Sequence, residues 1–363
     1  MGFNCGIIGL PNVGKSSLFN ALTRSEVQSK NYPFCTIDPN IGLVPVPDRR
    51  LKILSDYIDP LKTTPTTIEF VDIAGLVKGA SKGEGLGNQF LSHIRRVDAI
   101  AHVVRCFDNP DIAHIDENID PERDIEIIEM ELLLADLQIL TNAREKIEKQ
   151  AKFGDKSIKE RLNMLSFLVE EVGRGTKLIN IDDKKVVEAM KGYNLLTLKP
   201  TMYIANVDEE GLIKENQYVS ILNNAAKKEN ISVIKMCCKL EEELAFLEEN
   251  ERKEFLHEMG VEHAGLERVV TLGYKLVNLI TFFTAGKKEV KAWTLKKGGC
   301  AVEAAGKIHS DIARGFIRAE ITDFDIFCHY KSMNRIKEVG KIRLEGKDYI
   351  MKDGDIALFR FNV

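Results

Sequence analysis

One stretch near the start of the chain constrains its fold more than any other. An apolar run enters the sequence G-x-x-x-x-G-K-S at 9–16, and a helix-like run leaves it at 17–22. Gly9 and Gly14 let the backbone turn tightly, so that its N–H groups approach phosphate oxygens. The partial positive charge of the following helix N-terminus favours the same anions. The stretch therefore predicts a phosphate-binding loop between a strand and a helix, because a chance glycine–lysine turn does not explain both flanks.

Two residues of this loop have predicted chemical roles. Lys15 is expected to reach the β- and γ-phosphates of a nucleotide, and the Ser16 hydroxyl is expected to bind Mg²⁺. A polar segment at 31–40 contains two prolines and holds Thr36, the candidate second hydroxyl for the ion. Without the preceding phosphate-binding loop, this segment would be interpreted as an ordinary surface loop.

A second motif follows a β-rich run at 67–72, which ends in Asp72 and is followed by Gly75. This D-x-x-G arrangement places a carboxylate facing Mg²⁺ through water and a glycine N–H near the γ-phosphate. We therefore assign Asp72 to the metal site and Gly75 to catalysis as the γ-phosphate sensor. Leu76 replaces the glutamine that orients the attacking water in Ras-like switches, so another group must position that water. The glycine-rich residues up to 88 fit an order–disorder switch element or a plain linker.

A histidine is the candidate for that role. The run 99–107 has the pattern of a buried strand, and His114 lies in the polar loop that follows it. Loops after parallel strands face the ligand edge of such a sheet, and histidine can act there as acid, base or water-positioner. A surface histidine with no catalytic role is the alternative.

The base of the nucleotide is expected to lie at two later loops. GTPases read guanine with N-K-x-D, whose aspartate accepts from the donors on the edge of the guanine ring. Here the sequence after Asn206 has Val207 in place of lysine and the longer Glu209 in place of aspartate. The guanine readout is therefore degraded, and adenine becomes plausible. Cys238 and Lys239 follow the next strand, at the place of the second base-contacting loop.

The hydrophobic period changes to that of a helix after Asp120. Helical spacing continues to Gly154, and a second helix begins at the capping box Ser157-x-x-Glu160 and reaches Gly173. These segments predict a long antiparallel, coiled-coil-like hairpin. Its tip carries the basic residues Lys146, Lys149, Lys152, Lys156, Lys159 and Arg161. They indicate contact with an anionic partner such as RNA, or simply a solvated charged tip.

The last part of the chain changes character again. Strands are expected at 280–284 and 290–295, then a helix over 301–313 and further short strands at 349–351 and 355–361. This order suggests a small β-grasp module. The module is locally basic through Lys287, Lys288, Lys291, Lys296, Lys297, Lys307 and Arg314.

Composition narrows the setting of these modules. The 363 residues are 44% hydrophobic and 29% charged, with a net charge of −4, which describes a soluble globular protein without a global positive field. The seven cysteines are odd in number and form no C-x-x-C pair, so we expect reduced thiols in a cytoplasmic protein. No apolar run reaches membrane-spanning length, and no membrane partner is expected.

Taken together, these motifs resemble the Obg-like ATPases of the YchF group, within the translation-factor class of P-loop GTPases. The matching motifs are G-L-P-N-V-G-K-S at 9–16, P-F-C-T-I-D-P-N at 33–40, D-I-A-G-L-V-K-G-A at 72–80, G-E-G-L-G-N at 83–88 and N-V-D-E at 206–209. The resemblance implies an α/β fold in which a doubly wound P-loop G domain (1–120 and 199–278) carries an inserted α-helical hairpin (121–198). A C-terminal β-grasp domain resembling the TGS domain is expected at 279–363.

The resemblance also assigns residues. The family's phosphate-binding segment corresponds to Asn12, Val13, Gly14, Lys15, Ser16 and Ser17, and its adenine contact to Val207. The two base loops add Asn206, Glu209, Cys238 and Lys239 to the expected cofactor-binding set. The resemblance implies Mg²⁺ ligands at Ser16 and Thr36, to which the D-x-x-G motif adds Asp72, and His114 aligns with a loop histidine suspected in catalysis. Asn12 matches the asparagine that ligates K⁺ in some related switches, which makes K⁺ a second candidate cofactor. Cys237-Cys238 departs from the small serine or alanine commoner in the base loop.

We therefore expect an enzyme, a Mg²⁺-dependent P-loop ATPase that acts as a nucleotide switch, binds GTP more weakly and associates with ribosomes. Contact with rRNA is expected through the helical hairpin and the TGS-like domain. Two alternatives stay open. One is a GTPase with an altered base motif, and the other is a nucleotide-gated ribosome-binding scaffold whose hydrolysis is incidental.

Overall fold

The structure is a computed structural model that describes residues 3–27, 40–73, 86–112, 118–151, 156–181, 183–261 and 264–362. Its contacts divide the chain into two compact units. Unit 1 comprises Met1–Phe3, Leu43–Glu69 and Leu266–Val363, and unit 2 comprises Asn4–Gly42 and Phe70–Gly265. Leu43–Glu69 thus groups with the C-terminal part of the chain, whereas the sequence analysis assigned it to the nucleotide-binding domain.

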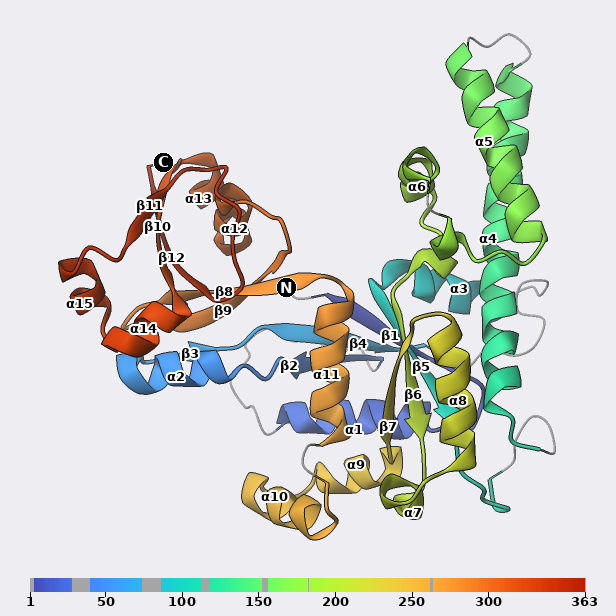
Figure 1. Cartoon of the computed structure of the whole chain (residues 1–363), viewed down its shortest axis with the longest axis horizontal. Helices are drawn as coiled ribbons and strands as arrows, with labels where there is room; N and C mark the ends of the chain where they lie inside the picture. The colour runs from blue at the N-terminus through green and yellow to red at the C-terminus, as the bar shows by residue number, and fades with distance from the viewer. Residues whose placement is uncertain are drawn as a thin grey trace. The chain divides into compact units, whose positions relative to one another are not determined.

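Unit 2 holds most of a sheet with the strand order β2-β4-β1-β5-β6-β7 (Figure 1). Its strands are β1 Asn4–Ile8, β2 Ile41–Pro45, β4 Thr67–Asp72, β5 Ala99–Arg105, β6 Thr201–Asn206 and β7 Ser232–Met236. β5 pairs in parallel with β1 and β6, and β6 pairs in parallel with β7. All seven residues of β5 are buried, as in a strand covered by helices on both faces of its sheet. The predicted P-loop α/β sheet is confirmed.

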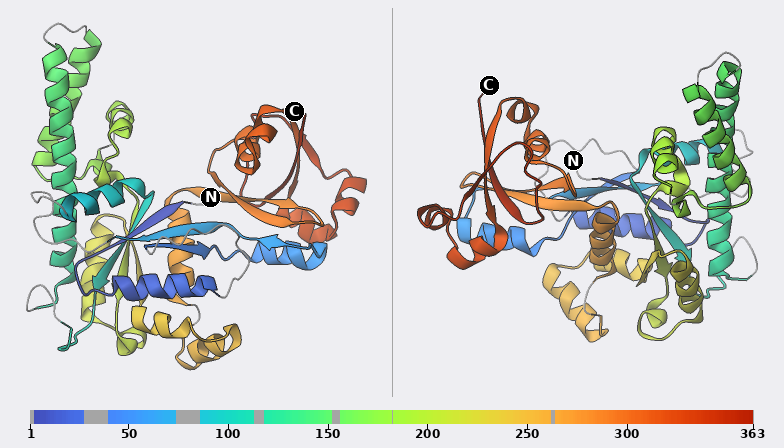
Figure 2. Two further views of the ribbon diagram at one scale, coloured as in Figure 1. Left: turned by 180° about the vertical axis from the view of Figure 1, so that it is seen from behind. Right: turned by 45° about the horizontal axis from the view of Figure 1, so that its top comes forward.

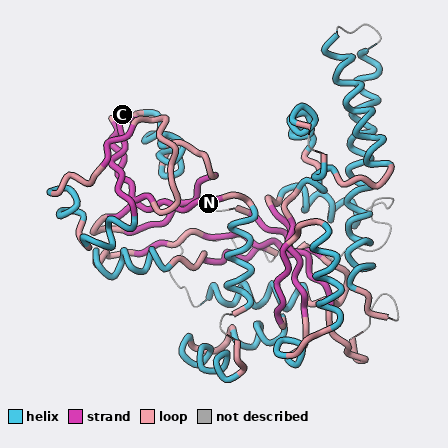
Figure 3. The backbone as a smooth tube through the Cα atoms, in the orientation of Figure 1, coloured by secondary structure: helices cyan, strands magenta, loops and turns pink. Residues whose placement is uncertain are grey.

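Helices connect these strands (Figure 3). In unit 2 they are α1 Lys15–Val27, α3 Leu86–Arg96, α4 Pro121–Ala151, α5 Lys156–Gly173, α6 Lys184–Met190, α7 Glu209–Ile213, α8 Gln217–Lys228, α9 Cys238–Leu244 and α10 Glu249–Glu258. Short 3-10 turns lie at η1 Leu178–Asn180, η2 Lys191–Tyr193 and η3 Leu196–Leu198.

The long helical hairpin is present as α4 and α5, which lie side by side in both views of Figure 2. Near its start, α4 packs Ile125 against the strand residue Val104. Further along, Leu140 packs in one cluster with Leu165 and Leu168 of α5. Pro121 at the first helical position and a capping acid before it explain where α4 begins. The hairpin that helical spacing predicted is therefore confirmed.

Unit 1 is a mixed sheet with the order β11-β10-β12-β8-β9-β3. Its strands are β3 Thr63–Thr64, β8 Leu279–Ala285, β9 Val290–Lys296, β10 Phe316–Asp323, β11 Arg343–Glu345 and β12 Asp355–Phe361. β12 and β8 pair in parallel, and β8–β9, β10–β12 and β10–β11 pair antiparallel. This is the arrangement expected of a β-grasp module.

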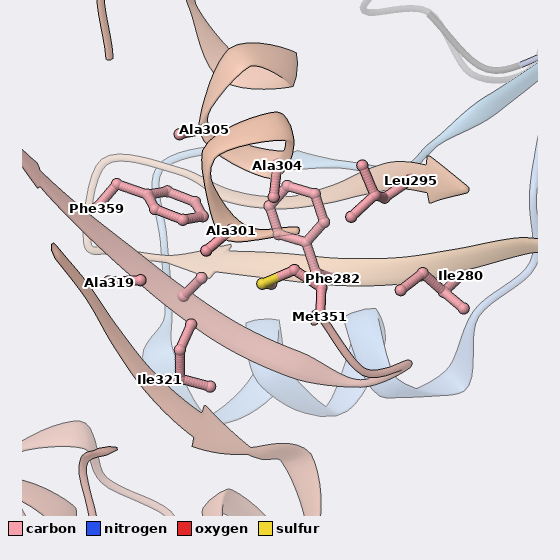
Figure 4. Packing of buried hydrophobic residues seen from close by; sticks show 11 residues of the cluster. Ile280, Phe282, Leu295, Ala301, Ala304, Ala305, Ala319, Ile321, Met351 and Phe359 are labelled. Carbon is pink, nitrogen blue, oxygen red and sulfur yellow. The ribbon is translucent and has the colours of Figure 1, made fainter. Parts of the chain in front are cut away.

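A helix rich in alanine packs on this sheet. α12, Ala301–Ile308, places Ala301, Ala304 and Ala305 against Phe282 and Phe359 (Figure 4). The expected helix over 301–313 is wrong in one respect, because it breaks at His309, which has extended backbone. The imidazole Nδ1 of His309 accepts from the N–H of Asp311 at 3.1 Å and so starts a new short helix, α13 Ser310–Arg314.

The other helices of unit 1 are α2 Arg49–Ile58, α11 Gly265–Leu276, α14 Phe324–Tyr330 and α15 Met333–Glu338. α2 buries Leu51 and Leu54 in one cluster with Phe283 and Ile356. β3 pairs in parallel with β9, so residues from the first fifth of the chain complete both the sheet and the core of the C-terminal module. Within the described ranges, no helix is both long and apolar enough to span a bilayer.

Candidate nucleotide-binding site

The loop between β1 and α1 has a backbone shape that demands glycine. Gly9 and Gly14 have φ of +150° and +102°, and Asn12 has φ of 59°, a value that asparagine tolerates better than most residues. A Cβ on Gly9 would lie 2.4 Å from the carbonyl oxygen of Val103. A Cβ on Gly14 would lie 2.2 Å from Nδ2 of Asn206. The main chain therefore approaches β5 and β6 too closely for any side chain.

Lys15 begins α1 and is almost fully buried. Its Nζ donates to the carbonyl oxygen of Leu10 at 2.7 Å. Burial lowers the pKa of the ammonium, and the carboxylate of Asp72 acts in the opposite direction. A phosphate would offer this buried cation a charged acceptor in place of a neutral carbonyl, and charge-assisted hydrogen bonds are the stronger kind.

The predicted metal ligands that the structure describes fit a hard cation. Burial raises the pKa of Asp72 at the end of β4, with Lys15 opposing the shift. Oδ1 of Asp72 is buried and has no hydrogen-bond partner among the described residues. Ser16 is exposed in the first turn of α1. Carboxylate and hydroxyl oxygens are the donors that Mg²⁺ accepts, usually together with water and phosphate oxygens. The third candidate, Thr36, lies outside the described residues, as do Gly75 and His114.

Asn206 joins the phosphate side of the site to the base side. From the end of β6, its Nδ2 donates to the carbonyl oxygen of Val13 at 2.8 Å, and its Oδ1 accepts from the N–H of Cys238 at 2.9 Å. Val207 is buried, and its N–H donates to Met236. Glu209 is exposed at the first position of α7. One amide side chain thus fixes the phosphate-binding loop relative to the start of α9.

These elements surround an open cleft with about 1250 Å³ of empty space, counting its solvent-open mouth. Its lining is Asn12, Gly14, Lys15, Ser16, Ser17, Phe107, Asp108, Asn109, Ile112, Asn206, Val207, Asp208, Glu209, Cys237 and Lys239. Of the predicted cofactor-binding residues in the described part of the chain, only Val13 and Cys238 are not in the lining. Both are buried behind it and bonded to Asn206.

The sequence analysis missed one wall of the cleft. Phe107, Asp108, Asn109 and Ile112 come from the loop that follows β5. A signal was available, because loops at the carboxyl ends of neighbouring parallel strands meet at one edge of the sheet. That rule was applied to His114 and not to the residues between it and the strand.

A G-K-S loop with a buried lysine, an aspartate on the neighbouring strand of the sheet and an asparagine bridge to a second loop define a P-loop nucleotide-binding protein of the GTPase type. Residues 4–142 match the family model described as 50S ribosome-binding GTPase. Residues 279–362 match the C-terminal YchF-GTPase model, which is described as a protein of unknown function.

Full-length relatives make the assignment specific. Proteins named Ribosome-binding ATPase YchF from Pasteurella multocida and Bacillus subtilis are 53% and 48% identical, and each comparison covers 100% of both chains. The solved Schizosaccharomyces pombe YchF GTPase has a TM-score of 0.91 and 36% sequence identity, covering 99% of this chain and 98% of that one. The chain belongs to the YchF family.

Proposed function

We propose that the chain hydrolyses ATP with Mg²⁺ at this cleft and acts as a nucleotide switch on the ribosome. The observation that carries the proposal is the position of Asn206. It begins an N-V-D-E sequence without the N-K-x-D lysine and aspartate, and it bonds both Val13 of the intact G-K-S loop and Cys238 of the second base loop. The names of the full-length relatives, ribosome-binding ATPases, agree with it.

The chain's own groups bind and orient the triphosphate. Backbone N–H groups of the loop ending at Gly14 hold phosphate oxygens, and Lys15 exchanges its bond to the Leu10 carbonyl for a phosphate oxygen. Ser16 and Asp72, with Thr36, hold Mg²⁺. Bound Mg²⁺ neutralises charge on the β- and γ-phosphates. Because little covalent chemistry is asked of the protein, positioning and charge account for most of the catalysis.

Base choice rests on Val207 and Glu209. The 50S ribosome-binding GTPase model and the S. pombe YchF GTPase are both named as GTPases, so GTP is the second candidate substrate. ATP is favoured here because Val207 replaces the lysine of the guanine-reading motif N-K-x-D. The longer Glu209 at the start of α7 replaces the aspartate that accepts from guanine.

Water positioning is assigned to residues outside the described part of the chain or to an ion. Leu76 cannot orient water, so His114 is proposed as the positioning group, with backbone N–H groups near Gly75 sensing the γ-phosphate. K⁺ held by Asn12 is the other candidate, and Asn12 is exposed at the cleft lining. The turnover rate of His114→Ala, measured in K⁺ and in Na⁺, separates the two hypotheses. Only positioning by K⁺ predicts that replacing K⁺ with Na⁺ lowers this rate.

Ribosome contact is assigned to the helical hairpin and the TGS-like module. Described basic residues near the hairpin tip, Lys146, Lys149, Lys156, Lys159 and Arg161, suit an rRNA backbone. Reversing the charge of Lys146, Lys149 and Lys159 together should weaken ribosome binding and reduce its salt dependence while leaving ATP turnover of the free protein unchanged.

The test of the main proposal is competition between ATP and GTP for binding and turnover, with and without ribosomes. Tighter binding and faster turnover of ATP are expected. Faster turnover of GTP at equal concentration would favour the altered-motif GTPase instead. If Lys15→Ala abolishes turnover but leaves ribosome association and cell function intact, the protein is a scaffold whose hydrolysis is incidental.

A further inference from the structure

Arg105, the last residue of β5, is only 1% exposed, which is unusual for a cationic side chain. Its guanidinium spreads over the loop that follows. Nε donates to the carbonyl oxygen of Phe107 at 3.1 Å, Nη2 to Asn109 at 3.0 Å and Nη1 to Ile112 at 3.0 Å. The guanidinium carbon also lies 4.8 Å from the centre of the Phe107 ring.

These bonds satisfy three backbone carbonyls of the loop, of which only that of Asn109 also accepts from the loop itself, from the N–H of Ile112 at 3.3 Å, among the bonds of the described residues. A buried carbonyl without a donor costs free energy comparable to a lost hydrogen bond, and a tight loop leaves several carbonyls pointing inward. The fork of Arg105 supplies three donors in one plane, a geometry that the single ammonium of lysine cannot reproduce. Burying a guanidinium costs free energy, so an apolar side chain would fill this part of the core at a lower cost.

The same loop is a wall of the nucleotide cleft. The three residues whose carbonyls Arg105 binds all line the cleft, together with Asp108. Two further side chains each hold the loop at one point: the carboxylate of Asp108 accepts from the Tyr218 hydroxyl at 2.9 Å, and Asn216 donates to the carbonyl oxygen of Cys106 at 2.8 Å. Arg105 is the support that reaches both the start and the end of this wall.

We propose that Arg105 is a positioning residue for the nucleotide reaction, which holds the loop from Phe107 to Ile112 as a preformed wall of the cleft. The proposal rests on the nucleotide-binding function argued above. Arg105 touches no substrate in it. Its effect is to spare the nucleotide the cost of ordering the loop, so its removal weakens binding of ATP and ADP alike.

The test compares Arg105→Lys and Arg105→Met with the full-length wild-type chain. Arg105→Lys keeps the charge and loses the fork, and Arg105→Met keeps the aliphatic length and loses every donor. Losing two or more such bonds should raise the ATP KM and the Kd of ADP by about tenfold in Arg105→Lys and further in Arg105→Met, with a smaller change in kcat. Arg343→Lys, which alters an arginine of unit 1 whose guanidinium donates to the carboxylate of Asp323, is the control and should leave both constants unchanged.

A merely structural role has a different signature. It lowers the fraction of folded, nucleotide-binding protein without changing the Kd or KM of the fraction that remains, and active-site titration separates the two cases. Wild-type Kd and KM in Arg105→Lys, whatever its melting temperature, overturn the proposal.

Hydrogen exchange keeps this test independent of the proposed ATPase activity. In nucleotide-free protein, amides from Cys106 to Ile112 should exchange at least tenfold faster in Arg105→Lys than in wild type, because the wall loosens. Unchanged exchange also overturns the proposal. If exchange accelerates as expected but the wild-type chain neither binds nor hydrolyses ATP, the function fails and the role of Arg105 as a loop support survives alone.

Discussion

Two walls of one cleft are held in place by opposite means. The phosphate-binding loop depends on its main chain, which passes so close to Val103 and Asn206 that no Cβ fits at Gly9 or Gly14. The loop after β5 depends on side chains, above all on Arg105, whose guanidinium binds three of its carbonyls. The first wall should fail when one carbon atom is added, and the second when a fork of donors is removed. The first is also recorded in a sequence motif, whereas the second leaves only one charged residue within an apolar run.

The largest effect is expected on the phosphate side. Lys15→Ala removes the buried cation that we propose binds the transferred phosphate, and we expect kcat for ATP to fall by about 10³-fold, as for loss of a preorganised charge stabiliser. Steady-state kinetics measure it. Lys214→Ala is the control, since that lysine is exposed and pairs with Glu210 one helical turn away. A loss of less than tenfold in Lys15→Ala would contradict the assigned role.

Adding one methyl group tests the main-chain wall directly. Gly14→Ala must strain a φ of +102° and push against Nδ2 of Asn206, which would break the bridge between the two loops. We expect nucleotide affinity to fall by about 30- to 100-fold, from a cost of about 2–3 kcal/mol. Isothermal titration with ADP measures it. Gly192→Ala, at a glycine with nothing within 4 Å of the added Cβ, should bind ADP normally.

The strand that supports both walls gives a pH prediction. His102 of β5 is 2% exposed, and burial lowers its pKa from 6.5 to about 3, with a smaller contribution from Lys15. Between these values the unfolded chain binds a proton that the folded chain does not, so stability rises with pH across this window. His102 alone should make the free energy of unfolding about 2 kcal/mol lower at pH 5 than at pH 7.

Urea unfolding of wild type and His102→Gln at both pH values checks this number. The variant cannot titrate at this position, so its stability should change with pH by about 2 kcal/mol less than that of the wild type. An equal pH dependence in the two proteins would mean that His102 gains a proton in the folded state as well.

The smallest effect is expected at the outer support of the second wall. Tyr218→Phe removes the hydrogen bonds to the Asp108 carboxylate on the exposed side of the loop. We expect the ATP KM to rise by no more than about threefold, because exposed hydrogen bonds exchange with water at a net cost near 1 kcal/mol or less. An effect as large as that of Arg105→Lys would show that both supports hold the wall equally, and would weaken the contrast with Arg105.

Sequence alone predicted the part of the candidate site whose residue types are required by the chemistry of the ligands. The glycines, Lys15, Ser16 and Asp72 follow from what a phosphate and a hard cation require, and the structure brings them to one edge of the sheet. It predicted the helical hairpin because helical spacing and proline capping act locally. It did not predict that His309 would end one helix and cap the next, since an apolar alanine pattern continues through it.

The sequence did not predict the long-range contacts of β3 and α2, for a different reason. β3 is two residues long and α2 looks like any amphipathic helix, so nothing local in them specifies partners more than two hundred residues later. Arg105 was passed over because it lies within the run 99–107, which otherwise has the pattern of a buried strand. Only the three-dimensional course of the loop reveals the carbonyls that it binds.

The insertion of α2 and β3 into the C-terminal sheet bears on how the protein is made. During synthesis Leu51 and Leu54 leave the ribosome long before Phe283, Val290 and Ile356, the residues that cover them in the finished core. β12, which joins the two halves of that sheet, is added almost at the very end. During most of its elongation, the nascent chain therefore lacks the residues that cover the apolar face of α2 in the folded protein. A C-terminal fragment that begins at residue 279 would lack Leu51 and Leu54, two leucines of its hydrophobic core.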